Sequence, residues 1–482
     1  MRANTISRRR FMYLGSAAAA GLVASFTRTS RAQAPKRPPN FVIIFTDDQG
    51  YNDAGCFGSR RIKTPNLDRM AAEGARLTSF CSAAPVCTPS RAALLTGCYP
   101  QRVGLAAIPR HEGDLTAPPH HVMRQDSPFG LHPSEITLAE LLRNAGYATG
   151  CIGKWHLGHL PPFLPPNHGF DYYFGLPYSN DMPPVYLIRG TETIETDVNQ
   201  ETLTERYTEE AVQFIRGHKD VPFFLYVPHS MPHVPLFVSG RFRGKSEGGL
   251  YGDVIETIDW GAGQILDTLK ELGLDSDTLV LFTSDNGPWY IKGEDGGNAT
   301  PWRAGKGTTY EGGMRVPCIV RWPGHIPAGL VSGEIATSMD IYPTFAHLAG
   351  LQVPQDRIID GRNIWPILSE PGAKTPHEAF YYYFGNELHA VRSGNWKLRL
   401  ETTLRDEDIY RRTPNLDTPM PEALYNLDVD PGEQKSVHKD HPDVVKRLHE
   451  LAEKARNDLG DARTGVTGKN VRPIGTLKDV QG

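Results

Sequence analysis

Three apolar segments of strand length constrain the fold of this chain more than any other feature of its sequence. They cover residues 40–46 (NFVIIFT), 222–227 and 278–283. A strand that is apolar at successive positions has both faces buried, which is typical of a parallel sheet covered by helices. Helical patterns lie between these segments, so the alternation predicts an α/β fold with a largely parallel sheet.

The rest of the pattern divides the chain into a main domain and a smaller C-terminal part. In the main domain we expect a short strand at 148–152 and helices at 67–73, 137–145, 201–216 and 252–272. From about residue 377 we expect short antiparallel strands at 379–384, 389–392 and 396–400, then an amphipathic helix at 442–457. We therefore predict a main domain over 35–375, a C-terminal α+β subdomain with a short antiparallel sheet over 376–460 and a polar tail over 461–482.

The first 34 residues have the features of an export signal. The run 8–10 (RRR) precedes a short, alanine-rich apolar stretch at 11–26, and 32–34 (AQA) offers a cleavage site of small residues. The segment resembles a twin-arginine signal, which implies a periplasmic or secreted protein with no stable membrane insertion after the signal is removed. A membrane anchor would need a longer apolar run; a retained basic tail is the other alternative.

The charge balance argues against nucleic acid as a partner. Residues 1–34 contain six of the 51 basic residues and no acidic one, so 45 basic residues face 55 acidic ones in the remainder, a formal charge of −10. Phosphate backbones favour net positive surfaces. A polyanionic substrate would instead need cations placed locally.

The segment 87–97 (CTPSRAALLTG) has the pattern of a nucleophile at the start of a helix. Pro89 suits the first helical turn, and Ser90 could bond the free N–H groups there. Arg91 lies one turn beyond Cys87, so the positive end of the helix dipole and a guanidinium would hold an anionic substrate against the cysteine. The alternative interpretation is a buried structural cysteine beside an ordinary helix.

Oxygen donors follow two of the apolar segments. Asp47 and Asp48 end the first, and Asp285 and Asn286 follow the third. Because α/β sheets bind ligands at the carboxyl ends of their strands, these four side chains can meet. Carboxylate and amide oxygens suit Ca²⁺ or Mg²⁺ better than zinc, and the absence of CxxC pairs makes a zinc–thiolate site improbable.

Further polar residues follow other predicted strands. Lys154 and His156 alternate along what we expect to be an extended segment after residue 152, so they would share one face. Lys306 lies between two glycines that would let the backbone approach a ligand closely. A proline- and histidine-rich connector at 105–131 is long for a loop, and it is either part of a pocket rim or a surface loop.

These motifs together resemble one family. The pattern Cys-x-Pro-Ser-Arg-x-x-x-Leu-Thr-Gly at 87–97 is similar to the signature of type I sulfatases, and the likeness to the arylsulfatase A-like branch runs in order through 41–317 and continues at 340–344 and 424–431. The resemblance implies an alkaline phosphatase-like fold with a large, mixed, mostly parallel sheet. It also implies that a formylglycine-generating maturation enzyme converts Cys87 to Cα-formylglycine, an aldehyde whose hydrate is the nucleophile.

The resemblance also implies roles for individual residues. Ca²⁺, with Mg²⁺ as a lesser alternative, would be bound by Asp47, Asp48, Asp285, Asn286 and residue 87. The expected catalytic residues are Cys87, Arg91, Lys154, His156, His233 and Lys306. Arg91 would hold the nucleophile, and Lys154, His233 and Lys306 would contact the sulfate. His156 would orient a hydroxyl of the formylglycine hydrate and later remove its proton, so that sulfate is expelled. The leaving alcohol would take a proton from His233 or Lys306. His229 is a weaker candidate, and Arg315 is expected to form a structural ion pair.

The function expected from this set is hydrolysis of a sulfuric ester, with release of inorganic sulfate from a sulfated carbohydrate or an aryl sulfate. Two alternatives remain open: a phosphonate monoester or phosphodiester hydrolase on the same fold, and a catalytically silent protein that binds sulfated glycans. The substrate itself depends on pocket-lining loops that the sequence does not reveal.

Overall fold

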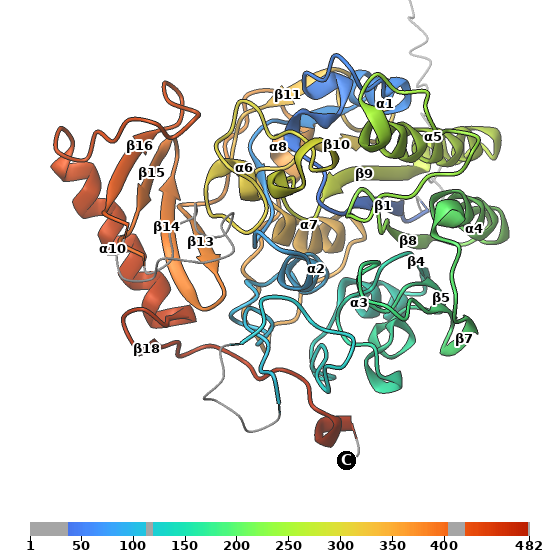
Figure 1. Cartoon of the computed structure of the whole chain (residues 1–482), viewed down its shortest axis with the longest axis horizontal. Helices are drawn as coiled ribbons and strands as arrows, with labels where there is room; N and C mark the ends of the chain where they lie inside the picture. The colour runs from blue at the N-terminus through green and yellow to red at the C-terminus, as the bar shows by residue number, and fades with distance from the viewer. Residues whose placement is uncertain (1–36, 112–118, 403–419, 481–482) are drawn as a thin grey trace, which may run out of the picture. The chain divides into compact units, whose positions relative to one another are not determined.

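A ten-stranded mixed sheet forms the centre of the main domain (Figure 1). The computed structural model describes residues 37–111, 119–402 and 420–480. The strands, in spatial order, are β11 (Leu330–Ser332), β2 (Ala75–Leu77), β10 (Cys318–Arg321), β9 (Thr278–Ser284), β1 (Asn40–Thr46), β8 (Phe223–Pro228), β4 (Ala148–Ile152), β5 (Tyr172–Gly175), β6 (Leu187–Arg189) and β7 (Glu192–Glu195). The strands from β9 to β5 run parallel, as the apolar segments predicted.

Strand β1 lies between β8 and β9 and is fully buried. Its side chains alternate between the two faces: Phe41 belongs to one apolar core and Val42 to the other. This explains why the segment is apolar at every position, since neither face meets water. The parallel strands β9, β1, β8 and β4 also end at the same edge of the sheet, where the polar segments that follow them begin.

Helices cover both faces of the sheet. One face packs against α1 (Pro65–Ala72), α4 (Leu203–Gly217) and α5 (Gly249–Glu271), and the other against α2 (Cys87–Thr96), α3 (Leu138–Asn144), α7 (Ile341–Leu348) and α8 (Trp365–Ser369). The four helices predicted from the sequence are present, with ends that differ by up to three residues. The start of α3 shows why such ends shift: Thr137, predicted as helical, is the N-cap and accepts a hydrogen bond from the Glu140 N–H at 3.1 Å.

The C-terminal part contains a four-stranded antiparallel sheet and one long helix (Figure 1). The strands are β13 (Phe380–Phe384), β14 (Glu387–Ser393), β15 (Trp396–Arg399) and β16 (Ala423–Asn426), and the helix is α10 (Pro442–Leu459). The sequence predicted three of these strands and the helix but not β16. The apolar face of α10 packs on this sheet, and the same cluster includes Ala93 of α2 and Tyr99.

The segment predicted as a polar tail packs back onto the main domain. Asp461 ends the short strand β17 (Gly460–Asp461), and Gly475 forms a bridge with Gly130 of the predicted connector. Residues 112–118 of that connector, and the predicted signal at 1–34, lie outside the described residues. The proposed domain boundaries stay predictions. None of the described helices is both long and apolar enough to span a membrane.

Arg102 joins three distant segments of the chain. Its guanidinium donates to both carboxyl oxygens of Asp360 at 2.7 Å, to Asp458 at 2.6 and 3.2 Å, and to the Asn470 carbonyl at 3.0 Å. The Arg102 side chain is fully buried, whereas that of Asp458 is 35% exposed. Burial of this kind makes the loss of one partner costly, because it leaves unpaired charge in a poorly solvated place.

We therefore expect the Arg102→Met variant to lose about 3 kcal/mol of unfolding free energy. Urea unfolding followed by circular dichroism measures the change. The matched control is Arg216→Met, which removes an ion pair whose side chains are 45% and 62% exposed and which should cost under about 1 kcal/mol. Equal effects of the two substitutions would contradict the structural role of Arg102.

Candidate active site

The acidic residues that follow β1 and β9 meet at the carboxyl edge of the sheet. The backbone N–H of Asp48 donates to Asp285 Oδ1 at 3.0 Å, and the Asn286 amide donates to Asp48 Oδ1 at 2.8 Å. Asp48 has a φ of 65°, a left-handed conformation that is costly for a residue other than glycine. The four predicted oxygen donors, Asp47, Asp48, Asp285 and Asn286, are at most 2% exposed. The fold thus brings together two segments that are far apart in sequence.

Cys87 is the first residue of α2 and faces this acidic group. Its Sγ lies 3.4 Å from Asp47 Oδ1 and 3.6 Å from Lys306 Nζ. Burial and the nearby Asp47 raise the pKa of the Cys87 thiol well above its ordinary value. The helix N-terminus therefore does not activate this residue as a thiolate at neutral pH.

Ser90 makes a different hydrogen bond from the predicted one, which was to free N–H groups of its own helix. Its hydroxyl donates instead to the carbonyl of Asp285 at 2.5 Å, and Val86 is the N-cap without a side-chain bond. Since Asp285 directly follows β9, this bond fixes the start of α2 to the end of that strand. The serine therefore positions the Cys87 helix relative to the acidic residues.

Arg91 lies between two carboxylates of the site, Asp47 and Asp285, and forms ion pairs with both. Its Nη2 lies 2.9 Å from Asp285 Oδ2 and 3.4 Å from Asp47 Oδ2, and its Nη1 donates to the Lys154 carbonyl at 3.0 Å. The sequence predicted that the Arg91 guanidinium would hold an anionic substrate against Cys87. In the structure the side chain is instead fully buried and paired with carboxylates. Burial and Asp47 raise the pKa of Asp285 to about 7, although Arg91 opposes the shift.

Two lysines approach the acidic pair from other loops. Lys154 Nζ contacts Asp47 Oδ2, and Lys306 Nζ lies 2.7 Å from Asp48 Oδ2. Burial alone would raise the pKa of Asp47, but Lys154 and then Arg91 outweigh it and hold the pKa well below the ordinary value. The pKa of Asp48 is raised by burial, against the opposing effect of Lys306. Both lysines can therefore neutralise an anion at this position.

His156 lies in the same loop as Lys154 but in a different local conformation from the one expected. Its φ of 63° breaks the regular extended chain that would have placed the two side chains on one face. His156 Nε2 is 2.8 Å from the carbonyl of Met123, so this nitrogen carries the proton and donates. Nδ1 is then a buried acceptor without a partner among the described residues, and burial, together with Lys154, lowers the pKa of the ring.

His233 follows β8 and reaches the acidic group from the other side. Its Nε2 is 3.7 Å from Asp48 Oδ2, while its Nδ1 lies 2.7 Å from the Val234 carbonyl and 3.1 Å from Asn180 Oδ1. Nδ1 therefore carries a proton and donates, which aims Nε2 at the site. Burial and Lys306 lower the pKa of this histidine well below its ordinary value. His229 instead packs its ring against Tyr207.

Four of these side chains form a group that can hold a metal ion. Ligand atoms of Asp47, Asp48, Cys87 and His233 all lie within 4.8 Å of one another. Asn286 Oδ1 is buried and has no hydrogen-bond partner among the described residues, so it is available as a further oxygen donor. Carboxylate and amide oxygens are the donors that hard divalent cations prefer. The residues present therefore fit a metal ion at this position.

Sequence reasoning missed two residues of the site. Ser179 Oγ accepts a hydrogen bond from Lys154 Nζ at 3.1 Å, and Asn180 lies beside the ring of His233. Both lie in the segment 177–181, which follows β5 and carries part of the family likeness. Nothing in the spacing of these two residues marks them as functional. The family likeness of the segment was therefore the only sequence signal that could have identified them. Arg315, expected to be structural, pairs with Glu311 at 3.3 Å.

Comparison with known proteins agrees with this arrangement. The family model described as Sulfatase matches residues 39–351, and the model described as the C-terminal region of aryl-sulfatase matches 375–477. The PsFucS1 sulfatase from Pseudoalteromonas sp. superposes with a TM-score of 0.76 at 30% identity, covering 87% of this chain and 90% of that one. These matches confirm the expected alkaline phosphatase-like fold.

Curated relatives are similar over most of their length. The N-acetylgalactosamine-6-sulfatase of Rattus norvegicus is 39% identical, covering 89% of this chain and 87% of the relative. The steryl-sulfatase of Homo sapiens is 36% identical, covering 77% and 76%. With the matched family models and the assembled site, these similarities establish that the chain belongs to the sulfatase family and hydrolyses sulfuric esters.

Proposed function

We propose that this protein removes sulfate from a sulfated carbohydrate, with Ca²⁺ as its metal ion and Cα-formylglycine at position 87. The observation that carries the proposal is the convergence of Cys87, Asp47, Asp48 and His233 within one buried group. Lys154 and Lys306 contact the same carboxylates.

Asp47, Asp48, Asp285, Asn286 and residue 87 would hold the cation. When bound, Ca²⁺ would polarise the sulfate oxygens, and the aldehyde at residue 87 would supply, as its hydrate, a hydroxyl nucleophile. Asp285 is fixed by Arg91 and by the Asp48 N–H, so it also keeps the two acidic segments in register. Asn286 contributes the oxygen that lacks a partner within the described part of the chain.

The chain's own cations and histidines would handle the substrate. Lys154, Lys306 and His233 surround Asp47 and Asp48, and would bind the sulfate oxygens that face away from the metal. His156 Nδ1 is the unpartnered acceptor, and it would take a proton from the residue at position 87. His233 or Lys306 would give a proton to the leaving alcohol. Arg91 would hold the helix and the acidic residues in place.

A sulfated sugar is favoured as substrate over a steroid. The relative from Rattus norvegicus carries a name that specifies a 6-sulfated N-acetylgalactosamine, and it is similar over more of this chain than the steryl-sulfatase. The connector segment that follows α2 contributes Met123, whose carbonyl bonds His156, and it therefore borders the site. The exposed Arg124 follows directly and is suited to an anionic substituent.

We also propose export by the twin-arginine route to the periplasm or beyond. The signal-like segment at 1–34 supports this proposal. Because that route carries folded proteins, a maturation enzyme could modify Cys87 in the cytoplasm first. A cell fractionation that finds the full-length, uncleaved chain only in the cytoplasm would overturn the export proposal.

A screen of sulfated mono- and oligosaccharides with inorganic sulfate as the readout tests the catalytic proposal. The protein is produced with a formylglycine-generating enzyme, and Cys87→Ala is the control. We expect sulfate release from at least one sulfated hexosamine or galactose and none from the control. Faster turnover of an aryl phosphonate ester than of any sulfate ester would overturn the choice of substrate, and an unmodified Cys87 thiol with intact glycan binding would favour a silent binding protein.

We expect the Arg91→Lys variant to lose about 100-fold in kcat with a smaller change in KM. A lysine has one ammonium group and cannot hold Asp47, Asp285 and the Lys154 carbonyl at once, and small displacements of catalytic groups cost on the order of 100-fold. Steady-state kinetics on the substrate found in the screen measures both constants. Arg216→Lys, on the surface of α4, is the control, and an Arg91→Lys variant within twofold of it would contradict the bracing role.

A further inference from the structure

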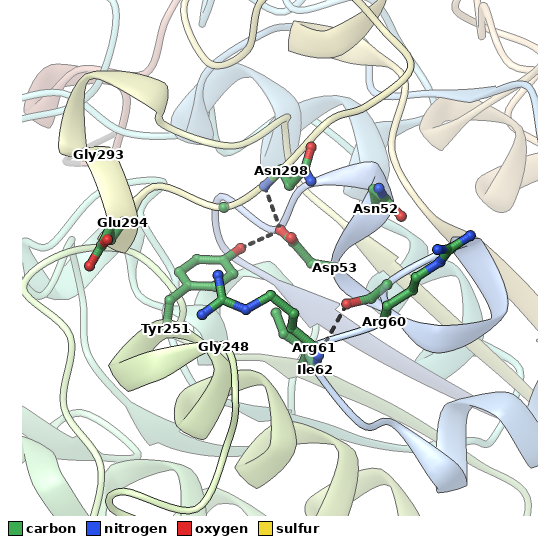
Figure 2. A pocket seen from close by; sticks show the side chains of 13 residues that line it. Asn52, Asp53, Arg60, Arg61, Ile62, Gly248, Tyr251, Gly293, Glu294 and Asn298 are labelled. Carbon is green, nitrogen blue, oxygen red and sulfur yellow. Dashed lines mark hydrogen bonds between the residues drawn. The ribbon is translucent and has the colours of Figure 1, made fainter.

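One cavity in the described part of the chain is lined by none of the residues predicted for the active site. It has a volume of about 540 Å³ and is bordered by the 3₁₀ helix η1 (Tyr51–Asp53), the turn at 58–62, the start of α5 and the segment 293–298 (Figure 2). A volume of this size is typical of small-molecule sites. The lining is unusual for an incidental surface hollow because it contains a buried carboxyl group.

Asp53 lies at the inner wall of this cavity and is 2% exposed. Its Oδ2 accepts three hydrogen bonds, from the Gly50 N–H at 2.8 Å, the Tyr251 hydroxyl at 2.6 Å and the Asn298 N–H at 3.1 Å. Figure 2 shows two of these bonds, from Tyr251 and Asn298, converging on the Asp53 carboxyl group. No hydrogen bond from the described residues to Oδ1 is formed, so this carboxyl oxygen is left for an occupant of the cavity.

Uncommitted donors and acceptors lie around this carboxyl group. Asn52 Oδ1 is buried and has no partner within the described ranges. The exposed Arg60 guanidinium makes no hydrogen bond or ion pair with the described residues, and Arg61 uses Nε and Nη2 on the Glu247 carbonyl, at 3.0 and 2.6 Å. The Arg61 side chain extends toward Tyr251, while that of Arg60 extends on the side of Asn52 (Figure 2). The cavity thus combines hydroxyl-binding groups inside with two cations, Arg60 and Arg61, and one exposed carboxylate, Glu294, in its lining.

One segment of chain connects this cavity to the sulfate-binding residues. At its start, Trp289 lies with its ring centroid 5.4 Å from that of His233 and 4.4 Å from Lys306 Nζ. At its end, Glu294 and Asn298 line the cavity. An elongated ligand that crosses this short segment would therefore reach both places.

We propose that the cavity is a distal subsite that binds an anionic sugar residue of the oligosaccharide whose sulfated residue occupies the active site. The Asp53 carboxyl and the Asn52 amide would bond sugar hydroxyls, and Arg60 and Arg61 would pair with a sulfate or carboxylate substituent. Two arginines at the rim disfavour a metal cation as the occupant. This inference rests on the proposed action on sulfated carbohydrate, and it adds that the substrate is an oligosaccharide with more than one anionic residue.

Binding to a hexasaccharide of chondroitin 6-sulfate tests the proposal. The Cys87→Ala protein is titrated calorimetrically with this probe, and Arg60→Ala/Arg61→Ala is added in the same background. We expect the double substitution to raise Kd by about tenfold, since it removes two charge-assisted contacts at an exposed rim. Affinity for N-acetylgalactosamine 6-sulfate, which is too short to reach the cavity, should stay unchanged.

Two matched controls locate the effect. Arg143→Ala/Lys446→Ala removes two exposed cations from α3 and α10 and should leave Kd unchanged. The chemically desulfated hexasaccharide retains its uronate carboxylates. If its Kd still depends on the two arginines, they bind a carboxylate. If that dependence is lost, they bind a sulfate. Hydrogen exchange should show protection of residues 52–62 and 293–298 by the hexasaccharide but not by the monosaccharide.

Equal affinity of the Arg60→Ala/Arg61→Ala variant for the hexasaccharide, or no protection of these two segments, would overturn the subsite. Failure of the catalytic proposal looks different, because the wild-type protein would then release no sulfate while the arginine-dependent binding persisted. If the wild-type protein does release sulfate, the double variant should raise KM for the hexasaccharide with kcat unchanged.

Discussion

The Cys87→Ser variant is expected to release alcohol from a sulfate ester no more than once per protein molecule and then to stop. A serine hydroxyl at this position offers one nucleophilic oxygen. Once it carries sulfate, it has no second hydroxyl from which sulfate could be expelled, so turnover should fall on the order of 10⁴-fold or more. Rapid-quench measurement of alcohol release, with intact mass analysis of the protein, follows both the single event and the retained sulfate.

Cys56→Ser is the matched control for this substitution. Cys56 is half-buried in the 3₁₀ helix η2 (Gly55–Phe57), outside the site, and its replacement should leave kcat within about twofold. Sustained turnover by the Cys87→Ser variant at more than a few per cent of the wild-type rate would show that a plain hydroxyl suffices. The requirement for a modified residue at position 87 would then be wrong.

The Lys397→Met variant is expected to lose about 3–5 kcal/mol of unfolding free energy, because it breaks a buried ion cluster. Lys397, on β15, is fully buried and lies 3.0 Å from Glu311 and 2.9 Å from Glu433. Its Nζ also donates to the Thr309 carbonyl at 2.8 Å. The segment that contains Thr309 and Glu311 also carries Lys306, so the C-terminal sheet holds in place the lysine that we propose binds sulfate.

The contribution of Glu311 to the free energy of unfolding depends on pH, and its direction follows from the pKa of this carboxyl. Burial alone would raise the pKa of Glu311, but Lys397, Arg392 and Arg315 outweigh it and hold the pKa well below the ordinary value of 4.5. A carboxyl whose pKa is lower in the folded state stabilises the protein fully above its unfolded value and loses that contribution as the pH falls through the folded value. The ion pairs of Glu311 should therefore stabilise the protein at neutral pH and weaken only in strong acid.

Guanidinium unfolding at neutral pH measures the effect of Lys397→Met. Lys374→Met is the control, because Lys374 is 83% exposed and its pair with Glu334 should contribute under about 1 kcal/mol. We also expect kcat of the Lys397→Met variant to fall further than its folded fraction explains. A loss of stability no larger than that of the control would mean that the C-terminal sheet does not depend on this cluster.

The central strands and the acidic residues after them could be predicted because each leaves a local signal. A strand buried on both faces, such as β1, must be apolar throughout, and Asp47 and Asp48 mark its end at the edge where ligands bind. Cys87, Lys154 and Lys306 were found because their motifs are contiguous and follow one another in a known order. The structure places all of them around one buried group.

Other features depend on contacts that no short stretch of sequence contains. Ser179 and Asn180 contact Lys154 and His233, which come from other loops. Ser90 bonds the Asp285 carbonyl of a distant strand instead of its own helix. The loop of His156 bonds two other segments, with Lys154 N–H donating to the Pro228 carbonyl and His156 N–H to the Pro177 carbonyl, and His156 itself is left-handed, so the regular extended chain expected there does not form.

The cavity at Asp53 and the cluster around Lys397 likewise could not be predicted from the sequence. Aspartate and lysine are usually solvated, and their burial depends on residues from other segments. In the structure both side chains are buried: Asp53 bonds Tyr251 and Asn298, and Lys397 pairs with Glu311 and Glu433. Tertiary packing, which the sequence pattern does not report, determines their chemistry.

Calcium titration calorimetry of the metal-free protein tests the central claim most directly, namely that Asp47, Asp48, Asp285 and Asn286 form one cation site beside residue 87. We expect one Ca²⁺ bound per chain, with binding lost in the Asp48→Ala variant and retained in Asp267→Ala, a change of an exposed carboxylate on α5. No Ca²⁺ binding by the wild-type protein, or undiminished binding by Asp48→Ala, would contradict it.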